Sequence, residues 1–193
     1  MESICGESIV DAYVCIIKSM IECCKDKASH NTTSRFHAVK IPSISIEDYV
    51  KRITKYFQCS YECFVCSLSY IDMLLADHFV LNAFSVHRTI LVSVMEAAKF
   101  YDDCFFNNEF YARVGGVPVE ELNALEMDFL FAIHFSLIVP LDAYQELHNE
   151  LFLHCSCICE NCHGLHIPHL DIVQKTPTYS YLCYSSTTFS DSR

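Results

Sequence analysis

Apolar side chains recur at three- and four-residue steps over most of residues 45–153, and this spacing is what most constrains the fold. Positions at these steps share one face of an α-helix. Glycine and proline, which break helices and supply the turns of β proteins, number only 4 and 5 among 193 residues. A chain of this length holds one compact core and is short of two ordinary domains. The sequence therefore predicts a single all-α domain.

Within this region the third helical segment is apolar on most sides, which predicts that it lies at the centre of the bundle. Ser45, with Asp48 three residues later, is a capping-box start for the first helix. Gly115 and Gly116 permit the left-handed turn that ends the fourth helix, and Pro118 suits the first turn of the fifth. The expected segments are 46–57, 61–77, 86–101, 109–114, 118–133 and a short last helix at 142–152.

Composition divides the whole chain into parts of different character. The first part contains an expected amphipathic helix, because its apolar residues also fall at helical steps. A hydrophobic content of 52% excludes disorder throughout the chain. The expected parts are an N-terminal helix in 1–27, a polar linker at 28–44, the helical bundle at 45–153, and a tail at 154–193 that is rich first in Cys and His and then in Ser and Thr.

The charge and the cysteine content of the chain limit the kinds of molecule it is expected to bind and the cellular compartment in which it is expected to lie. Lys and Arg total 13 against 24 for Asp and Glu, a net charge of -11, and no basic cluster is present. Direct binding of nucleic acid or of an anionic membrane is not expected, since both need positive charge on one face. The 13 cysteines are odd in number, and several stand among apolar residues as small hydrophobes do. Without a signal-peptide pattern or a membrane-length apolar run, they indicate the reducing cytoplasm or nucleus.

Several short motifs carry a resemblance to a known family. The most specific lie between His87 and Glu126, and they include the runs Asn107–Val117 and Glu121–Glu126. Together with the helix lengths, these motifs resemble the cyclin box, and they are similar to the P/U-type cyclins, the subfamily of the yeast phosphate-pathway cyclin. The resemblance covers about residues 44–150. It implies a single five-helix cyclin box with an additional N-terminal helix and a short C-terminal helix.

The resemblance also implies a function and roles for particular residues. A cyclin binds a cyclin-dependent protein kinase and stabilises the active arrangement of its αC helix. Lys99 and Glu126 match the charged pair that grips the kinase, and Arg52 and Asp72 match an ion pair that ties the first box helix to the second. Lys99 and Glu126 each lie in an otherwise apolar helical run, where a charge is costly unless it is paired. A purely structural ion pair or a snorkelled side chain is the alternative.

Asp102 and Asp103 follow the third helix, where a carboxylate is unfavourable to the helix dipole. One hypothesis is that an acidic residue here meets an arginine of the kinase activation segment, in place of a phosphate. The alternative is a pair of solvated turn residues. Arg113 belongs either to the same kinase-binding network or to the capping of nearby carbonyl groups.

The beginning of the tail concentrates thiol and imidazole groups, the ligands that Zn²⁺ prefers. A structural zinc site is one interpretation, although two well-spaced ligand pairs are not evident, and a reduced Cys-rich tail is the other. The CxxCH pattern of haem attachment also occurs at 159–163, but the preceding helices offer no haem-domain pattern. The candidate zinc ligands are Cys155, Cys157, Cys159, Cys162, His163 and His166.

No standard catalytic arrangement stands out: there is no phosphate-binding glycine loop, no GxSxG and no HExxH. We therefore expect a regulatory protein and not an enzyme, with no cofactor apart from the possible zinc. The alternative function is a cyclin-fold adaptor or zinc-binding scaffold that does not activate a kinase. Lys99 together with Glu126 favours the kinase regulator, because a scaffold has no reason to keep both.

Overall fold

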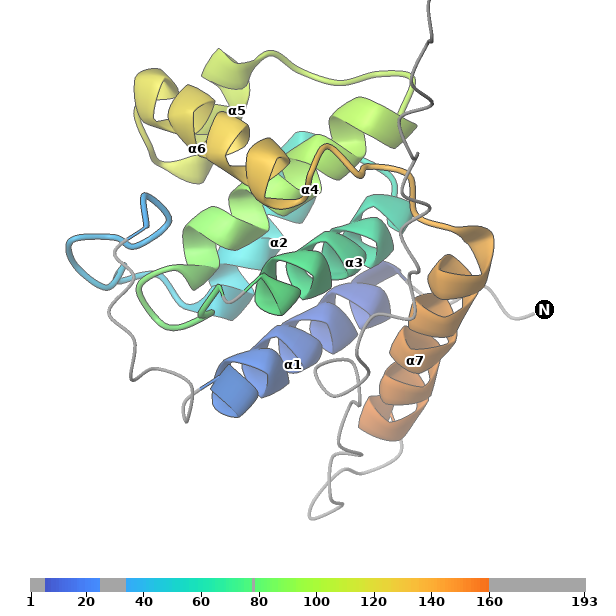
Figure 1. Cartoon of the computed structure of the whole chain (residues 1–193). Helices are drawn as coiled ribbons and strands as arrows, with labels where there is room; N and C mark the ends of the chain where they lie inside the picture. Colours follow the sequence, from blue (N-terminus) through green and yellow to red (C-terminus); the bar gives the residue numbers. More distant parts are fainter. Residues whose placement is uncertain (1–5, 25–33, 78, 160–193) are drawn as a thin grey trace, which may run out of the picture.

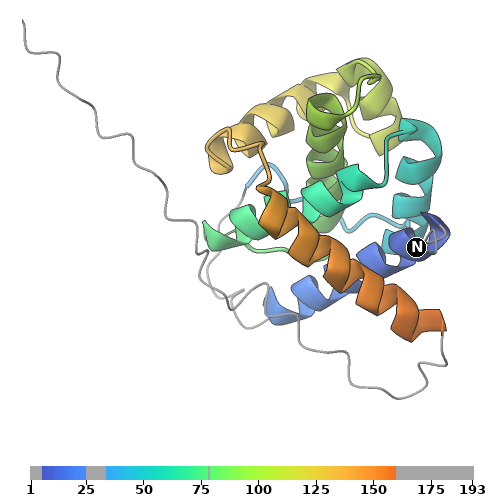
Figure 2. The same ribbon diagram turned by 90° about the vertical axis from the view of Figure 1, so that its right-hand side faces the viewer.

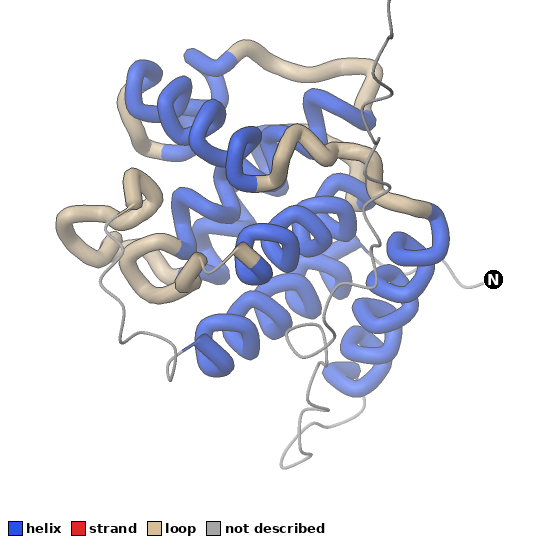
Figure 3. The backbone as a smooth tube through the Cα atoms, in the orientation of Figure 1, coloured by secondary structure: helices blue, strands red, loops and turns tan. Residues whose placement is uncertain are grey.

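The computed structural model describes residues 6–24, 34–77 and 79–159, and side chains within 10–151 of these ranges. The described residues form seven helices and no strand, which confirms the predicted all-α class (Figure 3). None of these described helices is long and apolar enough to cross a membrane. The helices are α1 (Gly6–Cys24), α2 (Ile46–Phe57), α3 (Glu62–Ala76), α4 (Val86–Tyr101), α5 (Asn108–Gly115), α6 (Val119–Ala132) and α7 (Leu141–Cys159).

Helix α4 lies at the centre of the bundle, as its sequence predicts. Its side chains are buried almost without interruption from Val86 to Ala98. Helices α2, α3, α5 and α6 all pack against it. Figures 1 and 2 show α5 and α6 on one side of α4, and α3, α1 and α7 on the other. Helices α2 to α6 thus form the expected five-helix unit.

The predicted helix ends are found with their expected chemistry. Ser45 precedes α2, and its hydroxyl accepts from the N–H of Asp48 at 3.0 Å and donates to the Asp48 carboxylate at 2.9 Å. Gly116 ends α5 with a φ of 72°, in the left-handed region that glycine adopts without strain. Helix α4 begins and ends at the predicted residues. Pro118 differs slightly, because it lies just before the first residue of α6.

Helix α1 packs against the bundle instead of standing apart from it. It contacts α2, α3 and α7. Tyr13, Ile17 and Met20 are fully or almost fully buried in these contacts. The Tyr13 ring meets Phe64 of α3 edge to face at 5.3 Å between ring centroids. The N-terminal helix is therefore part of the hydrophobic core.

Helix α7 is longer than the short helix expected at 142–152. It has 19 residues and continues through Cys159, so the predicted boundary of the tail at residue 154 falls inside a helix. The Cys- and His-rich composition suggested an end near Phe152. However, neither glycine nor proline occurs between Leu141 and Gly164, so nothing in the local sequence breaks the helix there.

Candidate functional site

Lys99 and Glu126 come together as the sequence analysis anticipates. Lys99 stands in the last turn of α4 and Glu126 in the middle of α6, and Lys99 Nζ lies 2.6 Å from Glu126 Oε1. Asn108, the first residue of α5, accepts from Lys99 and donates to Glu126. Asn108 also donates to Asn123 of α6 at 2.8 Å. The ion pair therefore joins three helices, and both charged side chains keep 20% of their surface exposed.

A second carboxyl group, Glu96, lies one turn before Lys99 and was not singled out from the sequence. Its Oε1 is 3.8 Å from Lys99 Nζ, and its side chain is 5% exposed. Burial raises the pKa of Glu96 to about 8, although Lys99 opposes the shift. Burial alone would also raise the pKa of Glu126, but hydrogen bonds from Lys99 and Asn108 bring it below its ordinary value. Near neutral pH Glu126 is therefore a carboxylate, whereas Glu96 keeps its proton.

Large apolar side chains are exposed on the same helices and on the segments that follow them. They belong to the end of α4, to the segment before α5, to α6 and to the connection between α6 and α7. We call this set the apolar face. Its members are Phe100, Phe105, Met127, Phe131, Phe135 and Ile138, with exposed fractions between 45% and 73%.

The connection between α6 and α7 is held in one conformation. The Tyr101 hydroxyl donates to the Leu137 carbonyl at 3.0 Å and accepts from the Val139 N–H at 2.8 Å. His134 and Phe135 have φ values of 53° and 55°, which non-glycine residues rarely adopt. This backbone keeps Phe135 exposed beside Phe131, at 5.2 Å between the ring centroids. The apolar face is therefore built into the fold.

Asp102 and Asp103 have different environments. Asp102 is partly buried and accepts from the hydroxyl of Ser60 at 2.6 Å and from its backbone N–H at 2.9 Å. Asp103 is exposed. Arg113 is exposed on α5, and it lies 3.9 Å from Glu109 rather than near either aspartate. Of the three predicted kinase contacts in this region, Asp103 and Arg113 are thus on the surface, and Asp102 is held by Ser60.

A family model described as cyclin matches residues 14–137 of the chain. The chain belongs to the cyclin family. The match includes most of α1 as well as α2 to α6, in agreement with the packing of α1 on the box. Cyclins are regulatory proteins and not enzymes as a family.

Curated relatives place this cyclin in the predicted subfamily. It is 44% identical over 124 residues to Cyclin-U4-2 of Arabidopsis thaliana, and the aligned residues make up 63% of the chain and 57% of that protein. It is 46% identical over 115 residues to Cyclin-P3-1 of Oryza sativa subsp. japonica, and the aligned residues make up 59% of the chain and 49% of that protein. It is 39% identical over 113 residues to the PHO85 cyclin-like protein psl1 of Schizosaccharomyces pombe, and the aligned residues make up 57% of the chain and 46% of that protein. The chain is thus a P/U-type cyclin, and it spans about half the length of these relatives.

One expected ion pair is absent from this cyclin, because Arg52 and Asp72 do not meet. Arg52 instead lies over the ring of Tyr49, with 5.1 Å between its guanidinium carbon and the ring centroid. Asp72 faces α7, and burial together with the neighbouring Glu150 raises its pKa to about 6. Helix α2 packs mainly on α1, α4 and α5, and helix α3 mainly on α4 and α7. The two residues therefore point into different interfaces, and the prediction of an ion pair between them was wrong.

The proposed zinc ligands of the tail cannot be compared with the structure. Cys155, Cys157 and Cys159 fall where only the backbone of α7 is described, and Cys162, His163 and His166 lie outside the described residues. The tail site therefore stays a prediction from the sequence.

Proposed function

We propose that this cyclin is the regulatory subunit of a cyclin-dependent protein kinase and that it stabilises the active arrangement of the kinase αC helix. The observation that carries the proposal is the largely buried pair of Lys99 and Glu126 on α4 and α6, two helices that also carry members of the apolar face. The name of the Schizosaccharomyces pombe relative, a PHO85 cyclin-like protein, supports a kinase of this class as the partner. A location in the cytoplasm or nucleus is part of the proposal.

The pair suits an interface because it is already fixed before a partner binds. Asn108 holds both side chains, so little rotamer freedom is left to lose on association. Both side chains are partly exposed and retain hydrogen-bonding capacity toward main-chain groups of another protein. Exposed aromatic residues nearby offer the apolar area that a stable complex needs.

Activation follows from differential binding and requires no catalytic group in the cyclin. An active kinase needs its αC glutamate paired with the lysine that holds the ATP phosphates. A rigid surface that fits αC only in that position shifts the kinase population toward the active state. The cyclin therefore supplies a surface and fixed charges, and all of the chemistry belongs to the kinase.

The experiment is an equilibrium binding measurement against a panel of purified cyclin-dependent kinases. The test variant is Lys99→Ala with Glu126→Ala, and the control is Lys18→Ala with Glu47→Ala, which removes an exposed Lys–Glu pair between α1 and α2. We expect the test variant to lose about 2–5 kcal/mol of binding free energy, as truncation of a desolvated charge pair usually does. The control should bind like the wild type.

Failure of every kinase to bind the folded wild-type chain would overturn the proposal. Equal affinities for the test variant and the control would also overturn it, because the Lys99–Glu126 pair would then have only a structural role. Binding that leaves the kinase inactive would favour the adaptor function instead.

A further inference from the structure

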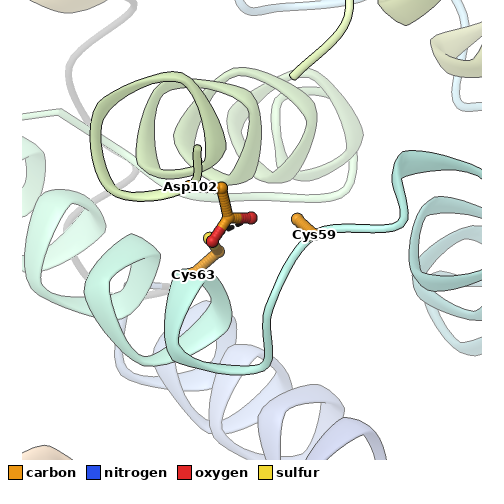
Figure 4. Close-up of side chains that lie close together, drawn as sticks. All are labelled: Cys59, Cys63 and Asp102. Atoms are coloured by element: carbon orange, nitrogen blue, oxygen red, sulfur yellow. Dashed lines mark hydrogen bonds between the residues drawn. The ribbon is translucent and has the colours of Figure 1, made fainter. Parts of the chain in front are cut away.

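Two cysteines and an aspartate lie together where the start of α3 meets the end of α4. Cys59 stands in the turn after α2, Cys63 in the first turn of α3, and Asp102 directly after α4 (Figure 4). Their sulfur and oxygen atoms all lie within 4.8 Å of one another. Cys63 Sγ is 3.4 Å from Asp102 Oδ2. Two segments about 40 residues apart in the sequence thus bring three metal-ligating groups to one place.

The separation between Cys63 and Asp102 fits a tetrahedral metal ion. Zn²⁺ takes thiolate sulfur at about 2.3 Å and carboxylate oxygen at about 2.0 Å. In a tetrahedron these bond lengths separate a sulfur and an oxygen ligand by about 3.5 Å, close to the separation between Cys63 and Asp102. We propose that Cys59, Cys63 and Asp102 form a zinc site that joins the start of α3 to the end of α4.

The carboxylate is oriented as a metal ligand should be. The Ser60 hydroxyl donates to Asp102 Oδ1 and the Ser60 N–H donates to Oδ2. The Cys63 thiol donates to Oδ2, so release of that thiol proton on metal binding would free the Oδ2 lone pair that faces the sulfur. Hydrogen bonds from neighbouring residues that fix a ligand in this way are usual around protein metal ions.

The charge around the cluster also favours a cation. Among the described residues, no lysine, arginine or histidine forms an ion pair with Asp102. The carboxylate of Asp102 and the thiol of Cys63 both lie close enough to the Cys59 thiol to interact with it electrostatically. Binding of Zn²⁺ would release the two thiol protons to solvent and leave two thiolates and a carboxylate around the ion. Cys59 and Asp102 are only partly buried, so a water molecule could supply the fourth ligand.

The site would fix a part of the fold that leads to the apolar face. Residues 103–107 run from the end of α4 to α5 and include the exposed Phe105. A metal bond at Asp102 would anchor the beginning of this segment to α3. We therefore expect zinc to raise the thermal stability of the protein whether or not a kinase is present.

The test uses the whole 193-residue chain, reduced and freed of metal with a chelator. The tail is also rich in cysteine, so the starting protein carries serine at Cys155, Cys157, Cys159 and Cys162. Two further variants are built on it: Cys59→Ser, and Cys104→Ser as the control, because Cys104 is an exposed cysteine outside the cluster. Zn²⁺ and Co²⁺ are titrated into each, with bound metal, thiolate–cobalt absorption and the unfolding temperature as readouts.

We expect the starting protein to bind about one Zn²⁺ per chain with thiolate ligands. Cys59→Ser should weaken binding by more than about tenfold and abolish the rise in unfolding temperature, whereas Cys104→Ser should change neither. If Cys59→Ser fails to fold, Asp102→Asn decides, with the same expected loss. A folded starting protein that binds no zinc, or equal binding by the Cys59→Ser and Cys104→Ser proteins, would overturn the site. These readouts involve no kinase, so their outcome is independent of the proposed function.

Discussion

The ionisation of Glu96 makes the stability of the protein depend on pH near neutrality. Burial raises its pKa from the ordinary 4.5 to about 8. Between these two pH values the folded protein therefore binds more protons than the unfolded chain. The free energy of unfolding must then fall as the pH rises through this window. The stabilising form is the protonated carboxyl group, which is fully present below pH 4.5 and lost above about pH 8.

Glu96→Gln replaces the titrating group with a neutral isostere that can still donate a hydrogen bond. We expect the wild type to lose on the order of 3 kcal/mol more stability than this variant between about pH 5 and pH 8. Urea denaturation at several pH values measures the free energy of unfolding of both proteins. Asp72 and His87 titrate in the wild type and in the variant alike, so their contributions cancel when the two free energies are subtracted. Parallel stability curves for the two proteins would contradict the raised pKa.

Asp103 is the exposed carboxylate after α4, whereas Asp102 is held by Ser60. If an acidic residue of this cyclin meets an arginine of the kinase activation segment, Asp103 is the one available. We expect Asp103→Lys to weaken kinase binding by about tenfold or more, with a smaller effect at high salt. Glu120→Lys, an equal reversal at another exposed position, is the control in the same binding assay. Equal affinities for the two variants would show that Asp103 is only a solvated turn residue.

At the residue scale the sequence predicts charged groups better than it predicts their partners. Lys99 and Glu126 stand out because each interrupts an apolar run. Asn108 and Glu96 complete the same cluster. A polar residue at the start of a helix and a single acidic residue within one are both common in sequences, so neither can be identified as part of a cluster from the sequence alone. Spacing along the chain also does not reveal which interface a side chain enters, which is why the expected pairing of Arg52 with Asp72 was wrong.

At the scale of single elements, α1 tests how far the core extends beyond the five-helix box. Ile17 is fully buried among α1, α2, α3 and α7. We expect Ile17→Ala to lower the free energy of unfolding by about 2–5 kcal/mol, the usual cost of such a cavity. Asp11→Ala, at an exposed position of the same helix, should change stability by less than about 0.5 kcal/mol.

Urea denaturation followed by circular dichroism distinguishes an integral helix from an attached one. An integral α1 gives a single transition that moves to lower urea in Ile17→Ala. A separate early transition for α1, with the main transition unchanged, would show that α1 is not part of the cooperative core.

The helix boundaries show which local signals are reliable. The start of α2 and the end of α5 were predicted correctly, because Ser45 and Gly116 have specific capping chemistry. The end of α7 was misplaced, since composition changes near residue 154 without any residue that breaks a helix. The packing of α1 on α3 and α7 depends on long-range contacts. The periodicity of apolar residues within one helix does not predict such contacts.

At the scale of the whole molecule, the fold follows from one nearly all-apolar helix surrounded by amphipathic ones. This pattern is visible in the sequence because α4 has no polar face to present to solvent. The surface arrangement is harder to predict. The exposed positions of Phe135 and Ile138 depend on the Tyr101 hydrogen bonds and on the left-handed backbone at His134 and Phe135, which fix the segment after α6 against the end of α4.

The most direct test of the account is the phosphotransfer rate of a purified cyclin-dependent kinase as the cyclin is titrated into it. We predict that the wild-type chain raises the rate to a plateau. The protein with Lys99→Ala and Glu126→Ala should need more than about tenfold higher concentrations for the same effect. A kinase that binds the wild-type chain but keeps its basal rate at saturation would contradict the claim that this surface stabilises the active αC arrangement.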